Sequence, residues 1–361
     1  MPVQEAVTTV VDDSKTELDT ETTLPHARTS GAPTLELVAA ESGVSRSTVS
    51  RVVNGSPKVR PEVVEAVNAA IERLNYVPNR AARSLASRQT YAIALLVPER
   101  VTTFFNDPFF ASVVQGITER MEDSDYILNL LVSSSDPTRK TRRYLRGGNV
   151  DGAFVVSHHD ADRDLADLCD IMPVVFGGRP ALADQATCHY VDIDNVHGAR
   201  TAVEHLVGSG RRRIATITGP DDMLAAVDRR RGWLEALRAA GLPADALAMG
   251  DFTESGGAGA MRLLLADWPD LDAVFVANDL MARGALEVLA EAGRSVPGDV
   301  AVVGYDDSPA ATATHPHLTT VAQPSELMGR GMAELLLALL AGEDPPHPDL
   351  LPTTLVTRQT S

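Results

Sequence analysis

The chain from Tyr91 onward alternates short apolar runs with longer amphipathic stretches. The apolar runs are bounded by turn residues and predict strands at residues 92–97, 127–132, 153–156, 174–176, 214–217, 273–276 and 300–303. Apolar residues spaced three and four apart predict helices at about residues 109–121, 195–208, 225–240, 256–266, 279–291 and 324–341. Such alternation is typical of parallel βαβ units, and the chain contains more of these units than a single sheet usually holds. The pattern therefore predicts an α/β region of two doubly wound subdomains with a ligand cleft between them.

Residues 34–76 have a helical pattern with short breaks and no strand signal. Two helices joined by a tight turn are expected, with Gly43 in the left-handed conformation at the turn. A third helix opens at Arg60 and Pro61. The expected core comprises Leu35, Val38, Ala39, Val44, Val49, Val52, Val64, Val67, Ile71 and Leu74. The segment predicts an all-α helix-turn-helix head, followed by a hinge or linker at residues 77–90.

The second of these helices has a polar face suited to nucleic acid. Ser45 is placed as its N-cap, which leaves Arg46, Ser47, Thr48 and Arg51 on or near the exposed side. Arginine and hydroxyl groups at a helix N-terminus can reach both major-groove bases and phosphates. A small helical bundle with a solvated basic face is the alternative.

The charge of the chain is unevenly distributed. The formal net charge is −17, which by itself argues against nucleic acid. Residues 1–33 contain six acidic and two basic residues. Residues 34–90 contain five acidic and eight basic residues, and residues 91–361 contain 38 acidic and 22 basic residues. The basic excess thus falls on the predicted head and linker, and the acidic body favours DNA binding through that part alone.

The rest of the composition narrows the class of protein. Residues 1–33 resemble a disordered extension, and neither a secretory signal nor an apolar run of membrane-spanning length is present, so we expect a cytoplasmic location. Cys169 and Cys188 lack metal spacing and form no disulfide framework, so both are expected as small buried hydrophobic residues. We predict no metal and no cofactor.

Residues 44–55 (VSRSTVSRVVNG) and 74–90 (LNYVPNRAARSLASRQT) closely resemble the recognition helix and hinge of the lactose/galactose repressor (LacI/GalR) family. The resemblance extends over about residues 34–358. It implies base contacts from Arg46, Ser47 and Arg51, and phosphate contacts from Ser45, Thr48 and Asn54. Leu37 and Val63 depart from the family pattern, where an acid and a phosphate-binding threonine are usual.

The resemblance also implies a hinge helix at residues 79–86 that forms on DNA. Leu85 from each subunit would enter the minor groove, and Asn79 and Arg83 would contact the DNA beside it. Two heads must read two half-sites of a near-palindromic operator, so a homodimer is expected. The leucine-heptad tail of the lactose repressor has no counterpart, which favours a dimer over a tetramer.

Beyond the hinge, the resemblance implies a periplasmic-binding-protein-like effector domain. Matching stretches are DPFFA (107–111), VDIDN (191–195), TGP (218–220), DRRRGW (228–233), AND (277–279), VGYDDS (303–308) and LTTVAQP (318–324). We place its first subdomain at about residues 91–209 and 323–351, and its second at about 210–322 and 352–358.

Four side chains in this domain are expected to hydrogen-bond sugar hydroxyls: Arg229, Asn278, Asp306 and Gln323. Phe252 is the expected aromatic platform. The pocket edge is assigned to Phe110, Ser157, His158, Arg179 and His197. The structural alternatives are a helix cap for Asp306, turn chemistry for Asn278 and a core position for Phe252.

Several stretches are similar to cellobiose-responsive repressors of GC-rich bacteria: PTLELVAA, GGRP, YVDIDN, GDFTESG and AVVGYDDS. They imply release from the operator by cellobiose or another β-glucoside. Relatives with nearly the same motifs respond to other sugars or to a corepressor, so both alternatives stay open.

Two other classes of protein compete with a regulator. An extracytoplasmic sugar-binding protein would lack the basic head and carry a signal peptide. An enzyme is disfavoured because the chain has no GxSxG, P-loop, GxGxxG after a first strand, or HExxH motif. Asp306 and Asp307 are sequence neighbours whose side chains should diverge, so they do not form a hydrolytic carboxylate pair.

Overall fold

The computed structural model describes residues 33–53, 56, 58–77, 89–132, 137–160, 165, 167–180, 188–346 and 350–361. The predicted hinge helix at 79–86, with Asn79, Arg83 and Leu85, lies outside these residues, as does Asn54. The chain divides into two compact units, Met1–Asn79 and Arg80–Ser361. Each unit is described by itself.

The first unit contains the three predicted helices: α1 (Leu35–Ser42), α2 (Arg46–Val53) and α3 (Pro61–Leu74). Thr34 caps the start of α1, and Gly43 ends it with a φ of 70°, a conformation that glycine adopts without strain. The buried centre consists of Val38, Val49, Val67, Ala70 and Tyr76.

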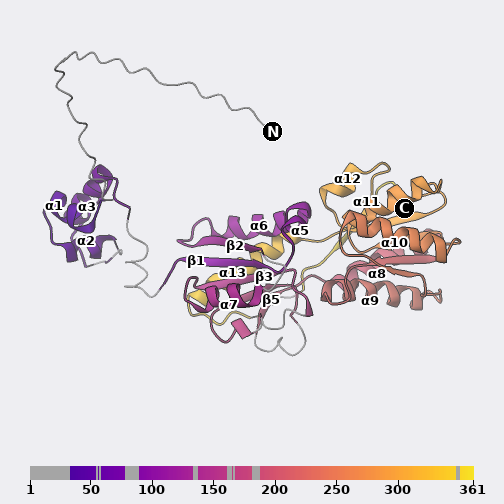
Figure 1. Ribbon diagram of the computed structural model, residues 1–361, viewed down its shortest axis with the longest axis horizontal. Coiled ribbons are helices and arrows are strands. Elements are labelled where there is room, and N and C mark those ends of the chain that lie inside the picture. The colour runs from indigo at the N-terminus through magenta and orange to yellow at the C-terminus, as the bar shows by residue number, and fades with distance from the viewer. Residues whose placement is uncertain are drawn as a thin grey trace, which may run out of the picture. The chain divides into compact units, whose positions relative to one another are not determined.

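The first subdomain of the second unit is a parallel sheet of order β2-β1-β3-β4-β5. Its strands are β1 (Ala92–Val97), β2 (Ile127–Val132), β3 (Gly152–Val156), β4 (Val174–Gly177) and β5 (His189–Val191). Its helices are α5 (Val101–Asn106), α6 (Pro108–Met121), α7 (Pro137–Arg146) and α13 (Ser325–Leu340). Figure 1 shows α13, from near the C-terminal end of the chain, among the elements of this subdomain.

Alternate residues of β1 pack on opposite faces of this sheet. Ile93 and Leu95 join a core with α6 and α13, whereas Ala94 and Leu96 join a second core on the other face. Helices α6 and α13 approach so closely that a Cβ on Gly116 would lie 1.9 Å from the backbone oxygen of Glu326. This arrangement is the doubly wound layer that the alternation predicts.

The second subdomain is a sheet of order β11-β10-β9-β8-β6-β7, parallel except for β11. Its strands are β6 (Ile214–Thr218), β7 (Leu247–Met249), β8 (Ala273–Val276), β9 (Ala301–Asp306), β10 (Thr319–Ala322) and β11 (Thr354–Val356). Its helices are α8 (Asn195–Gly208), α9 (Leu224–Ala239), α10 (Glu254–Asp267), α11 (Asp279–Glu291) and α12 (Pro309–Ala313). One face packs against α10 and α11 and the other against α8 and α9.

The boundary expected at residue 209 is wrong, because α8 belongs to the second subdomain. Ala199, Val203 and Leu206 of α8 pack in one core with Trp233 of α9 and Tyr305 of β9. The chain therefore crosses between the subdomains just after β5. The chain crosses twice more, between β10 and α13 and between α13 and β11.

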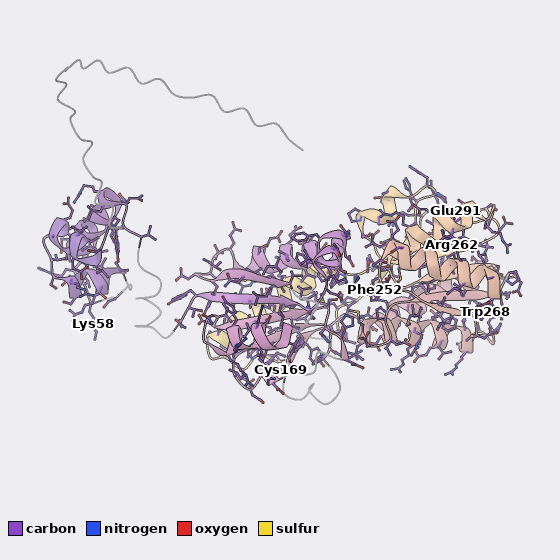
Figure 2. The ribbon with its side chains drawn as sticks, in the orientation of Figure 1. Lys58, Cys169, Phe252, Arg262, Trp268 and Glu291 are labelled. Atoms are coloured by element: carbon purple, nitrogen blue, oxygen red, sulfur yellow. A yellow bond between two sulfur atoms is a disulfide. The ribbon has the colours of Figure 1, made fainter. Side chains whose placement is uncertain are left out.

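The expectation for the two cysteines also needs correction. Cys169 and Cys188 form a disulfide, with a Cα–Cα distance of 5.9 Å, although both lie in an apolar core as expected. Figure 2 labels Cys169 in the first subdomain. The pairing depends on the return of the chain through β4, which residue spacing alone does not reveal.

Within the described part of the chain, no helix is both long and apolar enough to span a membrane.

Candidate nucleic-acid interface and ligand cleft

The N-terminus of α2 exposes the polar side chains that the sequence predicts there. The Ser45 Oγ accepts a hydrogen bond from the Thr48 backbone N–H at 3.2 Å, so Ser45 is the N-cap. The same hydroxyl lies 2.9 Å from the Ser47 Oγ and 2.8 Å from the Thr48 Oγ1. Ser47, Arg46 and Arg51 are exposed and Thr48 is half-buried. The helix thus presents two guanidinium groups and a hydroxyl cluster to solvent.

The described head has no net charge, but its helix α2 is purely basic. Residues 34–77 contain five acids and five bases, so the basic excess of the 34–90 segment comes from three arginines beyond the described helices. Helix α2 itself carries no acid. The Nε of Arg46 lies 3.1 Å from the Glu36 carboxylate, and both side chains are largely exposed. Arg46 would have to leave this ion pair to contact a base, whereas no ion pair is found for Arg51 within the described residues.

The two positions that depart from the family pattern have different surroundings. Leu37 is half exposed on α1, and Val63 packs partly against the core of the head. Val63 therefore contributes to packing and supplies no hydroxyl for a phosphate.

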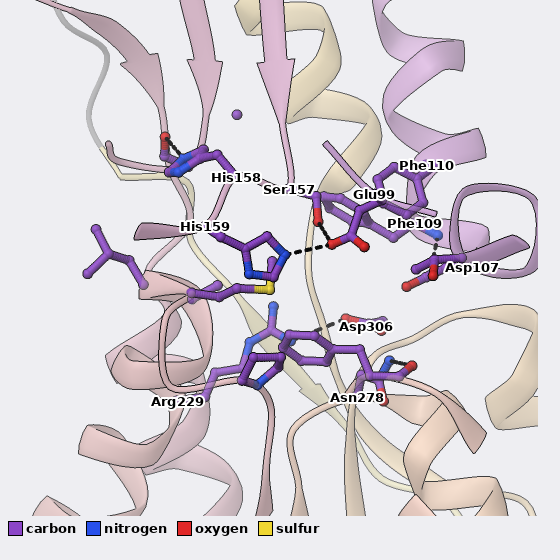
Figure 3. A pocket seen from close by; sticks show the side chains of 18 of the residues that line it. Glu99, Asp107, Phe109, Phe110, Ser157, His158, His159, Arg229, Asn278 and Asp306 are labelled. Carbon is purple, nitrogen blue, oxygen red and sulfur yellow. Dashed lines mark hydrogen bonds and ion pairs between the residues drawn. The ribbon is translucent and has the colours of Figure 1, made fainter. Parts of the chain in front are cut away.

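A cavity of about 370 Å³ lies between the two subdomains of the second unit. Its wall is formed at the carboxyl ends of β1, β3 and β4 on one side and of β6, β8 and β9 on the other. All six residues assigned to effector binding line it: Phe110, Arg229, Phe252, Asn278, Asp306 and Gln323. Ser157, His158 and Arg179 line it as well, whereas His197 does not. The volume falls in the range of small-molecule sites. Figure 3 shows the side chains of several residues that line the cavity.

Arg229 is the central cation of this cavity and donates three hydrogen bonds to the protein. Its Nε donates to the Asn195 Oδ1 at 2.9 Å, its Nη1 to the Ala277 carbonyl at 2.6 Å, and its Nη2 to the Gln323 Oε1 at 3.1 Å. The guanidinium also stacks 3.7 Å from the centre of the buried Tyr305 ring. Arg229 therefore positions polar groups from several elements around the ligand space.

Asp306 and Gln323 form one polar unit with Arg229. The Gln323 Nε2 donates to the Asp306 Oδ1 at 2.6 Å, and that oxygen lies 3.7 Å from the Arg229 Nη1. Burial raises the pKa of Asp306 well above the usual value, against the lowering effect of Arg229. Gln323 comes directly after β10 and links the two subdomains at one crossing of the chain.

Asn278 is the N-cap of α11, a capping role that the sequence suggested for Asp306 and not for Asn278. Its Oδ1 accepts from the Met281 N–H at 2.9 Å, and its Nδ2 donates to the Phe252 carbonyl at 3.0 Å. The amide retains one N–H and one lone pair for a ligand. Asn278 consequently fixes the backbone of Phe252, which lies between the two subdomains (Figure 2).

Three residues of the cavity wall have a left-handed backbone without being glycine. The φ angles are 62° at Ser157, 64° at Phe252 and 118° at Asp306. Such conformations are unfavourable for residues with a Cβ and cluster at ligand sites. Their presence at three strand ends or turns around one cavity marks it as a functional site.

The sequence did not single out several charged residues of this cavity. Asp107 caps α6 by accepting from the Phe109 N–H at 2.9 Å, and burial raises its pKa to about 6. Glu99 and His159 follow β1 and β3, and Asp192 and Asp228 lie near Arg179. For Glu99, His159 and Asp192, the position just beyond a strand end was the available signal, since parallel strands bring their carboxyl ends to one edge.

Comparisons with known proteins agree with this architecture. Residues 34–79 match the model of bacterial regulatory proteins of the lacI family, and residues 203–361 match a periplasmic binding protein-like domain. The chain is 48% identical to the HTH-type transcriptional regulator CelR of Thermobifida fusca, covering 86% of this chain and 93% of the relative. It is 35% identical to the ribose operon repressor of Escherichia coli, covering 84% and 92%.

Solved structures agree as well. The transcriptional regulator CelR–cellobiose complex matches with a TM-score of 0.73 and 46% identity, covering 91% of this chain and all of the other. The lac repressor dimer bound to operator and an anti-inducer matches with a TM-score of 0.81 and 31% identity, covering 91% and 99%. The chain belongs to the lacI family of bacterial regulatory proteins.

Proposed function

We propose that this protein is a transcriptional repressor of carbohydrate-utilisation genes. It binds a near-palindromic operator as a homodimer and is released by a small neutral sugar, for which cellobiose or another β-glucoside is the candidate. Sequence is read in the major groove by Arg46, Ser47 and Arg51 of α2. Ser45 and Thr48 hold the phosphate backbone near the helix N-terminus, whose N–H groups favour anions.

The observation that carries the sugar proposal is the lining of the cavity between the subdomains. Amide and carboxyl groups of Asn278, Asp306 and Gln323 offer donors and acceptors for hydroxyl groups, and Phe252 offers a flat apolar face. Arg229 already donates three hydrogen bonds to the protein and lies 3.7 Å from the Asp306 Oδ1, so few of its N–H groups remain to pair an anionic ligand. A neutral polyhydroxyl compound fits this chemistry.

The choice of cellobiose rests on relatives. CelR is the more similar of the two curated relatives described, and a CelR structure contains cellobiose. A disaccharide would span the cavity from the Arg229 side toward the carboxyl end of β3.

Release follows from a shift between arrangements of the two subdomains. Operator binding needs both heads and hinges at one spacing, and a sugar that favours another arrangement lowers the population of that state. No catalytic step is proposed, since the described relatives are transcriptional regulators. Asp307, the neighbour of Asp306, is turned to an ion pair with Arg358 at 2.6 Å.

Calorimetric titration of the full chain with a panel of neutral sugars tests the ligand. We expect saturable binding of cellobiose and little or no binding of ribose or of an acidic sugar. Binding of another sugar with no response to cellobiose would discard cellobiose and keep the regulator.

A further inference from the structure

Two ionic contacts join the subdomains beside the cavity, and the sugar-binding role proposed above does not require them. One involves His159, directly after β3, and the other involves Arg179, directly after β4. Their partners are Asp222 and Asp228, from the loop after β6 and from α9 of the second subdomain. Both contacts therefore cross the cleft.

His159 is held between carboxylates of both subdomains. Its Nε2 lies 3.1 Å from the Glu99 Oε1 (Figure 3), and its Nδ1 lies 3.0 Å from the Asp222 Oδ1. The Ser157 hydroxyl donates to the same Glu99 oxygen at 2.9 Å. Next to the ring, the Asp160 N–H donates to the Asp222 backbone carbonyl at 2.9 Å. A charged contact and a backbone hydrogen bond thus cross the cleft at one point.

Arg179 makes the second ionic contact across the cleft. Its Nε lies 2.7 Å from the Asp192 Oδ2 in its own subdomain, and its Nη2 contacts the Asp228 carboxylate across the cleft. Asp192 is buried and Asp228 nearly so, so this pair is less screened by solvent than a surface pair. The two bridges lie on the side of the cavity formed by α9.

The geometry indicates that His159 holds the two subdomains together and does not hydrogen-bond the ligand directly. Both ring nitrogens already face carboxylates, so the ring offers the cavity mainly its carbon atoms. Hydrogen bonds to Glu99 and Asp222 raise the pKa of His159 to about 9 against the opposing effect of burial, which keeps the imidazolium form at neutral pH. Both N–H groups are then donors to the protein.

We propose that His159 and Arg179 form a cross-cleft clamp with Asp222 and Asp228, and that this clamp sets the affinity for the sugar by stabilising the arrangement that encloses it. This inference rests on the proposed sugar-binding function. A ligand bound between two subdomains binds only the fraction of molecules in the competent arrangement, so weakening the clamp lowers the apparent affinity without removing a ligand contact.

The discriminating variant is Asp222→Asn, because Asp222 does not line the cavity. Its matched control is Asp221→Asn, since Asp221 is the adjacent exposed acid and pairs with Arg230 of its own subdomain at 2.9 Å. Calorimetry on the full chain should show about twofold to fivefold weaker cellobiose binding for Asp222→Asn, a modest effect because Asp222 is half exposed. Asp221→Asn should bind as the wild type does.

Two further readouts separate a clamp from a general structural effect. In a double-mutant cycle, His159→Gln combined with Asp222→Asn should lose little more affinity than either variant alone. The wild-type affinity should fall as pH rises through about 9, because the charged ring is needed, and the His159→Gln profile should be flat there. Additive losses and identical pH profiles would overturn the clamp.

Amide hydrogen exchange without sugar tests the clamp even if no sugar of the panel binds. The segment 157–160, which includes the Asp160 amide, should exchange faster in Asp222→Asn than in Asp221→Asn. Equal exchange in both variants contradicts the clamp, whereas failure of every sugar to bind, with unequal exchange, contradicts only the proposed ligand.

Discussion

Phe252 owes its position over the cavity to the absence of a side chain at Gly219. A Cβ built on Gly219 would lie 2.2 Å from the Cζ of the Phe252 ring. Gly219→Ala should therefore displace the ring and weaken sugar binding about threefold to tenfold, the range expected for losing one aromatic contact. Calorimetric titration measures the effect. Gly259→Ala is the matched control, because its Cβ would meet no atom within 4 Å; equal affinities of the two variants would show that the ring is not a platform.

Asp107 shows the cost of burying a carboxyl group in the cavity wall. Its pKa is raised from 3.8 to about 6, mainly by burial. The folded state therefore holds this proton more tightly than the unfolded state, so this group lowers the free energy of unfolding as pH rises from about 4 to 6.

Asp107→Asn should raise the free energy of unfolding by about 1–2 kcal/mol at pH 7.5, since asparagine also caps helices and does not ionise. The gain should vanish below about pH 4, where the wild-type carboxyl is neutral as well. Urea unfolding at several pH values measures this difference. A loss of stability at pH 7.5, or a gain independent of pH, contradicts the assignment.

At the scale of elements, α2 concentrates the groups that are expected to read DNA. Arg51→Ala should cost about 1–3 kcal/mol of operator affinity at one base pair if Arg51 reads guanine, and the preference at that position should relax. Anisotropy titrations against operators substituted one base pair at a time measure this. An equal loss on every sequence would show that Arg51 contacts only phosphate.

The elements were predictable from periodicity, but their assignment to sheets was not. The strands β1, β2, β3, β4, β6, β8 and β9 coincide with the apolar runs, and the main helices with the amphipathic stretches, within a few residues. The pattern of α8 shows that it has one apolar face, but not which sheet that face covers, so the first crossing was misplaced. The short strands β5 and β7 have three residues each and too little pattern to be recognised.

The sequence pattern also does not reveal which residues come together in the cleft. The six effector residues were placed by resemblance, and they do line one cavity. Glu99, His159 and Asp222 were not found, because their contact joins three strand ends from two sheets and leaves no spacing in the sequence. The disulfide was missed for a similar reason.

In the whole molecule, we expect DNA binding and sugar binding to be two readouts of one equilibrium between arrangements of the subdomains. A net charge of −17, with the basic excess confined to residues 34–90, implies that the body repels DNA and that contacts come from the head and linker. Affinity for the operator should therefore fall steeply with salt, as counterions are released from the phosphates that the head neutralises.

The most direct test is a fluorescence anisotropy titration of the full chain against duplex DNA from upstream of the neighbouring genes, with and without cellobiose. A scrambled duplex is the control for sequence specificity. We expect tight, sequence-specific binding to the operator, and we expect cellobiose to release the protein from it. Equal binding to the scrambled duplex, or operator binding strengthened by cellobiose, would contradict a sugar-released repressor.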